Sequence, residues 1–270
     1  MIRRLVFCGL FVAGASFAAQ ALAQDVMFAY SFEEGSSRQY RVKLSQELAF
    51  SGNTMGQIGD FEVTLKCLSV ADGVASMELV FDKADMMREM FGNQAADPLA
   101  DMLVGHGIVF KVDPSGEVSD IAQSGYYDGW DSVQPFVEPL VKGWFPRLPG
   151  RAHAPGGTWE SSDTEKGADG TDVKVTAHYT YKENKKQGGV DCASVTGDLA
   201  TEVAGTSVSP MGTFQVEGGG KGKFEFLFDP AARAIVKLKS RMTVDMDLTP
   251  RAGGDTVDTS VNYQMERELL

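Results

Sequence analysis

The chain has 270 residues, of which 25 are Lys or Arg and 37 are Asp or Glu, so its formal net charge is -12. This acidic balance argues against nucleic-acid binding, which needs a basic face to displace counterions from phosphates. A hydrophobic fraction of 43% with 23% charged residues is typical of a globular chain and excludes wholesale disorder.

The first 23 residues predict a secretory signal peptide. Arg3 and Arg4 form a short positive region, an apolar stretch follows, and residues 21–23 read Ala-Leu-Ala, a small-residue cleavage signal. We expect the mature chain to begin at Gln24 and to be soluble in the periplasm or outside the cell. Cys8 lies too early to be a lipid-attachment cysteine, and no later apolar run approaches the roughly 18 residues of a membrane span.

Alternation of apolar and polar residues dominates the rest of the chain. From Ala234 to Leu248 the even positions are mostly apolar and the odd positions mostly polar, which predicts a strand with one face on a core. Its fifteen residues, at roughly 3.3 Å each, would span about 50 Å, so the strand must coil or bend. Similar patterns predict strands over residues 26–32, 40–50, 61–70, 77–81, 108–112, 173–181, 214–216, 224–228 and 257–265. We therefore expect a mainly β protein with one or two strongly curved antiparallel sheets, half-barrel or sandwich-like.

Short helices are expected only in the first half. Residues 82–91 place Met87, Met90 and Phe91 on one face, which predicts an amphipathic helix. Asp97 and Pro98 are typical of the start of a second short helix, through residue 104.

The stretch 125–150 has apolar residues at helical spacing, interrupted by Pro135, Pro139 and Pro146. Because proline breaks the helical hydrogen-bond ladder, we expect no more than one or two helical turns there. We regard residues 84–145 as an insert packed on the concave side of the sheet.

Two related halves are predicted after the signal peptide of residues 1–23. The first is a β unit of residues 24–150 that carries the insert, and the second is a β unit of residues 151–270. The sequence Cys67-Leu68-Ser69-Val70 is echoed by residues 192–195, and in both places the inward phase of the strand changes directly after the cysteine. Such a phase change indicates a β-bulge, and its repetition indicates internal duplication.

A family resemblance rests on the order of four short motifs along the second half. They are Pro146-x-Leu148-Pro149, Gly157-Thr158-Trp159, Cys192-Ala193-Ser194-Val195 and Phe228-Asp229-Pro230. In this order the chain resembles a family of uncharacterised bacterial secreted proteins and lipoproteins, which are also mainly β. The likeness covers most of residues 26–270, although this chain lacks the lipobox cysteine of the lipoprotein members. The resemblance implies a fold and no known activity, so no functional residue is carried over from it.

Catalytic and metal-binding patterns are sparse. The three histidines are not spaced with one another or with cysteines as metal ligands, and no nucleophile-elbow motif occurs. The glycine-rich run 218–223 lacks the spacing and the following helix of a phosphate loop, so we expect a flexible hairpin connection. We expect no cofactor, no metal site and no catalytic residue, and we retain an envelope hydrolase only as a remote third function.

The insert and the long strands suggest a place for a ligand. If they meet on the concave side of the sheet, an apolar pocket can form between them, and the Gly and Pro residues flanking the insert would let it move as a lid. The residues expected to line the pocket are Met87, Met90, Phe91, Trp130, Phe136, Trp144, Val236, Leu238 and Met242.

Two functions follow from the same residues, according to whether a cavity is left. The first is a non-catalytic cell-envelope protein that binds an apolar or amphipathic ligand such as a lipid. The alternative is a structural or interaction module, with an envelope protein as its partner, in which the insert fills the concave face at normal interior density.

The mature chain has two cysteines, Cys67 and Cys192, and both fall at inward positions. An oxidising compartment favours a disulfide between them, whereas burial as free thiols is the competing outcome.

Overall fold

Strands make up most of the protein in the computed structural model, which describes residues 25–167, 170–209 and 212–270. The predicted signal peptide and the cleavage site before Gln24 lie outside the described residues. Within them the protein is mainly β and antiparallel, as the alternation predicted. No helix in these ranges has both the length and the apolar character needed to cross a membrane.

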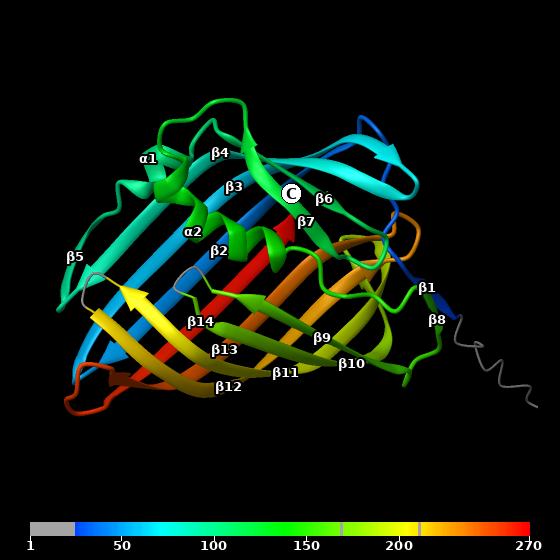
Figure 1. Ribbon diagram of the computed structural model, residues 1–270. Coiled ribbons are helices and arrows are strands. Elements are labelled where there is room, and N and C mark those ends of the chain that lie inside the picture. Colours follow the sequence, from blue (N-terminus) through cyan, green and yellow to red (C-terminus); the bar gives the residue numbers. More distant parts are fainter. Residues whose placement is uncertain (1–24, 168–169, 210–211) are drawn as a thin grey trace, which may run out of the picture.

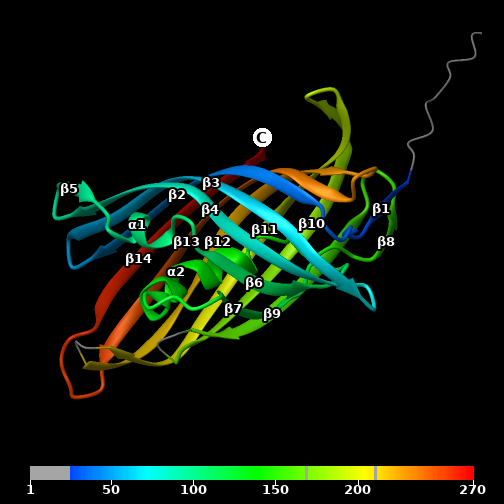
Figure 2. The same cartoon turned by 90° about the horizontal axis from the view of Figure 1, so that it is seen from above.

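One antiparallel sheet of 12 strands forms the body of the molecule, and it curls into an open trough (Figures 1 and 2). The strand order is β7-β6-β4-β3-β2-β14-β13-β12-β11-β10-β9, and β5 pairs with β4 outside this path. The strands are β2 Ser37–Phe50, β3 Asn53–Ala71, β4 Val74–Met90, β5 Asn93–Ala96, β6 Gly107–Val112, β7 Val118–Ser124, β9 Thr158–Lys166, β10 Asp172–Gln187, β11 Val190–Ser209, β12 Gly212–Asp229, β13 Ala234–Pro250 and β14 Val257–Leu269.

The first and last long strands, β2 and β14, lie side by side in the middle of the sheet (Figure 1). Their register sets Leu44 opposite Met265, and both side chains are buried on the concave side. The expected halves 24–150 and 151–270 therefore form one continuous sheet. Their origin by duplication stays a prediction, although β3 does carry an irregularity between Cys67 and Ser69, where a bulge was predicted. The second bulge was predicted after Cys192, near the start of β11. There the irregularity lies in the partner strand β10, between Tyr181 and Glu183.

Residues 82–90 are strand, so the helix expected over residues 82–91 is wrong. The β3–β4 register passes from Val63↔Phe81 to Glu62↔Lys83 and leaves Asp82 as an extra residue. This bulge reverses the phase of the alternation, so Met86 is buried on the concave face whereas Met87 points to the opposite face. Pairing with the long strand β3 overrides the helical spacing of the methionines.

The other predicted helical segments do form. Helix α1, Leu99–Leu103, begins where the Asp97-Pro98 pair placed it, and the Asp97 carboxylate accepts a hydrogen bond from the backbone N–H of Leu99 at 3.0 Å. Helix α2, Trp130–Lys142, is longer than the one or two turns expected, since it runs through Pro135 and Pro139. Both prolines lie on its exposed side, where water can satisfy the carbonyls that they leave unpaired.

The glycine-rich run 218–223 lies in the interior of strand β12, so the expected hairpin connection is wrong. Gly218, Gly220 and Gly222 alternate along the concave face between Val216 and Phe224. The register between β12 and β13 also slips between Leu227 and Phe228, which makes Val236 an extra residue of β13.

A separate two-stranded sheet pairs β1, Val26–Phe28, with β8, Arg151–His153. It closes one end of the trough, where the Phe28 ring lies 5.1 Å from Trp159 and 5.3 Å from Phe228 between ring centroids. Cys67 and Cys192 are buried free thiols, so the disulfide considered from the sequence does not form. Burial is the main cause that raises the pKa of both thiols.

Candidate functional site

Helix α2 and the residues after it cover part of the trough, and there the trough is filled. Trp144 is 1% exposed, and its ring meets Tyr40 edge-on at 5.5 Å between centroids. The Phe136 ring lies 5.9 Å from Phe61. Val137 of α2 is fully buried in the same apolar core. The lining expected between insert and strands is therefore close-packed beneath α2.

The structure divides the residues expected to line one pocket. Trp130 and Phe136 are half-buried against the main core, and Trp144 and Leu238 are buried within it. Met242 lies further along the trough, beyond the helix, in a second apolar cluster.

The other four do not join them. Met87 points to the convex face and is 38% exposed, whereas Met90 is on the concave side but at the far end of β4, where it is 44% exposed. Phe91 is in a turn with a φ of 54°, and Val236 is the bulge residue of β13. The misread helix and the two bulges account for these displacements.

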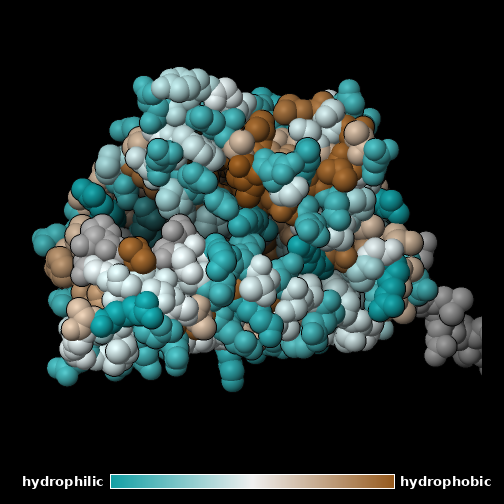
Figure 3. Space-filling model, viewed as in Figure 1, coloured by the Kyte–Doolittle hydropathy of each residue, from teal (hydrophilic) through white to brown (hydrophobic). Residues whose placement is uncertain are grey.

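Beyond α2 the trough is uncovered, and we call this region the open end. Figure 3 shows a hollow there, to the left of the helix in the view of Figure 1. Its apolar wall belongs to β10–β13, and it consists of buried Val203, Val216 and Val244 with half-buried Val173, Phe214, Met242, Met246 and Leu248.

The opposite wall of the open end, on β2–β4, is mixed, because a polar row lies there beside an apolar row of Leu48, Met55 and Met90. Register places Gln46, Gln57 and Arg88 on the concave side, and the Gln57 amide donates to the Asp97 carboxylate at 2.9 Å. Gln46 and Arg88 are exposed. The open end therefore has an apolar wall on β10–β13 and, across the same hollow, a mixed wall that carries one polar row.

The glycines of β12 make the apolar wall possible. A Cβ on Gly220 would meet the Thr243 carbonyl oxygen and the Val244 side chain, and one on Gly218 would meet the Asp245 carbonyl oxygen. Without side chains on β12, the residues of β11 and β13 close over its backbone. The Thr201 hydroxyl lies 3.1 Å from the Met242 sulfur although one strand separates them. The glycines thus form a crease along which the sheet bends.

Tyr263 of β14 is placed between the two walls. It pairs with Gln46 of β2 on one side and with Met242 of β13 on the other. Its hydroxyl donates to the Met265 sulfur at 3.6 Å, and burial raises the pKa of Tyr263 to about 12. The side chain therefore stays neutral and offers a hydroxyl group in apolar surroundings.

A second feature is an arginine in the core, which the sequence reasoning missed. Arg267 follows Met265 on the inward face of β14 and is 2% exposed. Its guanidinium carbon lies 4.4 Å from the Trp144 ring centroid and 5.3 Å from that of Tyr40. The inward alternation Val261, Tyr263, Met265 contained the signal, because its next member is Arg267.

A further cavity lies on the opposite, convex face. It is a groove of about 1000 Å³ that runs across the strands from β3 to β10. Register aligns Lys43, Glu266, Lys239 and Glu225 in one row along it, and Lys239 and Glu266 form an ion pair at 3.0 Å. The groove is lined by charges of both signs.

In the described ranges no group of His, Cys, Asp and Glu is arranged to hold a metal ion. His178 is exposed and lies 3.0 Å from the Glu160 carboxylate, whereas His106 stacks on Tyr127 at 3.9 Å between centroids.

Comparison with solved structures finds the same fold in lipovitellin. A lipovitellin structure that describes lipid–protein interactions superposes with a TM-score of 0.52 at 11% identity, covering 89% of this chain. The chain spans about a quarter of that protein, since 25% of lipovitellin is covered. A DUF1329 family protein from Desulfovibrio piger aligns over 84% of each chain at 10% identity, with a TM-score of only 0.18. No protein-family model and no curated protein matches the sequence.

Proposed function

We propose that this protein is a non-catalytic cell-envelope protein that binds an amphipathic ligand, such as a lipid, in the open end of the trough. The observation that carries the proposal is an apolar wall on β10–β13 that faces a polar row on β2–β4. An acyl chain could lie against Met242, Met246 and Leu248, while its polar group faces Gln46 and Arg88.

Two further observations support this assignment. The fold is shared with lipovitellin, and lipid–protein interactions are described for that protein. The pattern of residues 1–23 predicts export, so the protein would meet its ligand in the periplasm or outside the cell. Membership of the secreted family suggested by the four motifs stays a prediction.

The proposal differs from the pocket expected from the sequence in where the ligand lies. Beneath α2 the trough is filled, so the ligand is placed beyond the helix. The residues expected to contact the ligand are therefore Met242, which the sequence also predicted, together with Met246 and Leu248.

A charge on the apolar wall tests the proposal. Met246→Glu puts a carboxylate on the half-buried concave side of β13, where desolvation opposes both the charge and an acyl chain beside it. The control is Thr243→Glu, which adds the same group to the exposed convex face of the same strand, opposite Lys221.

The readouts are mass spectrometry of organic extracts from purified protein and titration with a fluorescent fatty-acid analogue. We expect lipid in extracts of the wild type and of Thr243→Glu, and a binding constant at least tenfold weaker for Met246→Glu. A clean wild-type extract with no saturable binding of the analogue would contradict the proposal.

A filled trough beneath α2 favours a second candidate, an interaction module of the cell envelope. Trp144 and Val137 pack there as in an ordinary core, without room for a ligand of lipid size. A clean extract combined with a stable protein partner in an envelope pull-down would select this alternative.

A further inference from the structure

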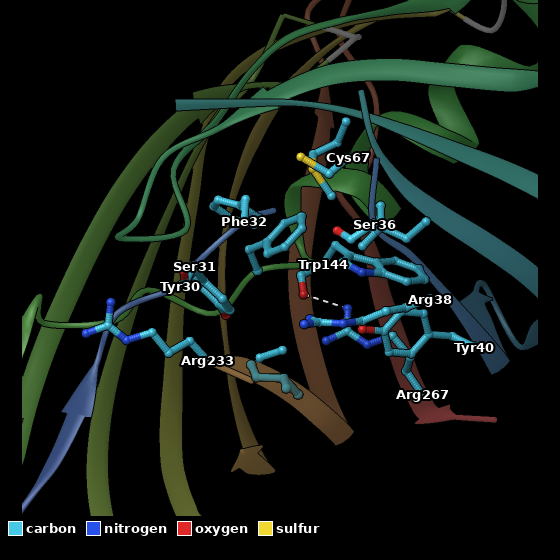
Figure 4. A pocket seen from close by; sticks show the side chains of 15 residues that line it. Tyr30, Ser31, Phe32, Ser36, Arg38, Tyr40, Cys67, Trp144, Arg233 and Arg267 are labelled. Atoms are coloured by element: carbon cyan, nitrogen blue, oxygen red, sulfur yellow. Dashed lines mark hydrogen bonds between the residues drawn. The ribbon is translucent and has the colours of Figure 1, made fainter. Parts of the chain in front are cut away.

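Arg267 holds a positive charge in the core without a carboxylate partner. Its Nη1 donates to the Trp144 carbonyl oxygen at 2.6 Å, and its Nε has no hydrogen-bond partner within the described part of the chain (Figure 4). None of the ion pairs found there includes Arg267. Burial lowers the pKa of Arg267, yet a guanidinium remains protonated in proteins. The fold therefore buries a cation whose charge it does not balance.

A small cavity lies beside this guanidinium. Its volume is about 30 Å³, and its walls include Tyr40, Trp144 and Phe145 from the core. Since a water molecule needs roughly 10–15 Å³ by this measure, the cavity has room for a small polar group beside the guanidinium.

The rim of the cavity adds positive charge and no negative charge. Arg38 and Arg233 line it, together with the exposed Ser31 and half-buried Ser36, and no Asp or Glu is among the lining residues. The Arg38 guanidinium donates to the Ala232 carbonyl oxygen at 3.2 Å, whereas Arg233 extends away from Arg267 (Figure 4). An anion entering between them would meet no carboxylate among the lining side chains.

We propose that this cavity is a carboxylate-binding site in which Arg267 pairs with the anion. The unpaired Nε–H belongs to the edge of the guanidinium that carboxylates bind in a bidentate way. Stacking against Trp144 and Tyr40 holds the guanidinium plane in place, so little freedom is lost on binding. The carboxylate comes from a small organic acid or from the headgroup of a fatty acid. The site lies beside Trp144 and Phe145, which follow α2, apart from the open end, and does not rest on the function proposed above.

The experiment uses acetate and octanoate as probes, with methyl octanoate as the uncharged control. The Nε–H resonance of Arg267 in a ¹⁵N-arginine spectrum is followed during each titration, and affinities are measured by calorimetry. We expect a saturable shift of this resonance with both acids and none with the ester. Octanoate binding at least tenfold tighter than acetate identifies a fatty-acid headgroup, and equal affinities identify a small acid.

Arg267→Met removes the charge at nearly constant length, and it should weaken acetate binding at least tenfold. Arg41→Met is the matched control, because Arg41 lies on the neighbouring strand β2 and pairs with Asp60 on the exposed face. If the methionine variant does not fold, Arg267→Lys keeps a point charge without the planar fork and should still lose several-fold in affinity.

An unshifted Arg267 resonance with both acids would overturn the proposal, as would full acetate affinity in a folded Arg267→Met protein. Either result would assign the cavity to bound water. Acetate has no acyl chain that could contact the apolar wall of the open end. The acetate titration therefore tests the Arg267 site independently of the Met246→Glu experiment.

Discussion

A methyl group added to the crease of the sheet should be costly. In Gly220→Ala the new Cβ would lie 2.8 Å from Val244 Cγ2 and 2.9 Å from Val244 Cα, and closer still to the Thr243 carbonyl oxygen. Ordinary contact needs roughly 3.5–4.0 Å, so β12 and β13 must separate by nearly 1 Å at a point where they are hydrogen-bonded. Overpacking of this kind costs about 1–3 kcal/mol.

Gly56→Ala is the control, since it is also a strand glycine but its Cβ would meet nothing nearer than the Gln46 carbonyl oxygen at 3.5 Å. We expect this variant to match or slightly exceed the wild type, because alanine restricts the unfolded chain. Calorimetry should show Gly220→Ala melting roughly 2–12 °C lower, at about 2–4 °C per kcal/mol for a protein of this size. Equal melting temperatures for the two variants would refute the claim that β12 needs glycine because β13 packs closely over its backbone.

Three further predictions concern ionisation, thiols and processing. Because Tyr263 has a folded-state pKa of about 12 against roughly 10 when unfolded, its contribution to stability is complete below pH 10 and is lost as the pH rises from 10 to 12. In Tyr263→Phe the unfolding free energy should fall by up to about 2.7 kcal/mol less than in the wild type over this pH range. Urea titrations of both proteins at pH 9 and pH 11.5 measure this. The same difference in unfolding free energy between the two proteins at both pH values would contradict it. Cys67 and Cys192 should resist alkylation in the native protein and both react in denaturant without reductant, whereas a mass showing a bridged pair would be incompatible with two free thiols. The exported protein should begin at Gln24, and intact-mass measurement that finds Met1 retained would exclude cleavage.

Alternation along the chain was sufficient to predict the fold class, because a sheet with one buried face imposes a two-residue period. It also placed Leu238 and Met242 on the concave side. The errors arose where an extra residue shifts the phase. The bulge at Asp82 made the methionines that follow it resemble a helical stripe, and the register slip of β13 removed Val236 from the inward set.

Glycine and proline were misread for a related reason. Gly220 was interpreted by its usual role in turns, yet here it lies in a strand where two neighbouring strands close over the backbone. Pro135 and Pro139 were expected to end a helix, but both lie on its exposed side. Which side of an element faces water depends on long-range packing, which no local pattern contains. Arg267, in contrast, could have been found by extending the inward alternation of β14 by one step.

The most direct test of the account is to locate the ligand by photo-crosslinking. A fatty acid carrying a diazirine at the end of its chain would be bound to the purified protein, irradiated, and the modified residues identified by peptide mass spectrometry. We expect light-dependent labels on the apolar wall of the open end, at Met242, Met246 or Leu248, with labelling suppressed in Met246→Glu. Labels confined to the convex groove around Lys239 and Glu266, or labelling equally strong in Met246→Glu, would contradict binding in the trough.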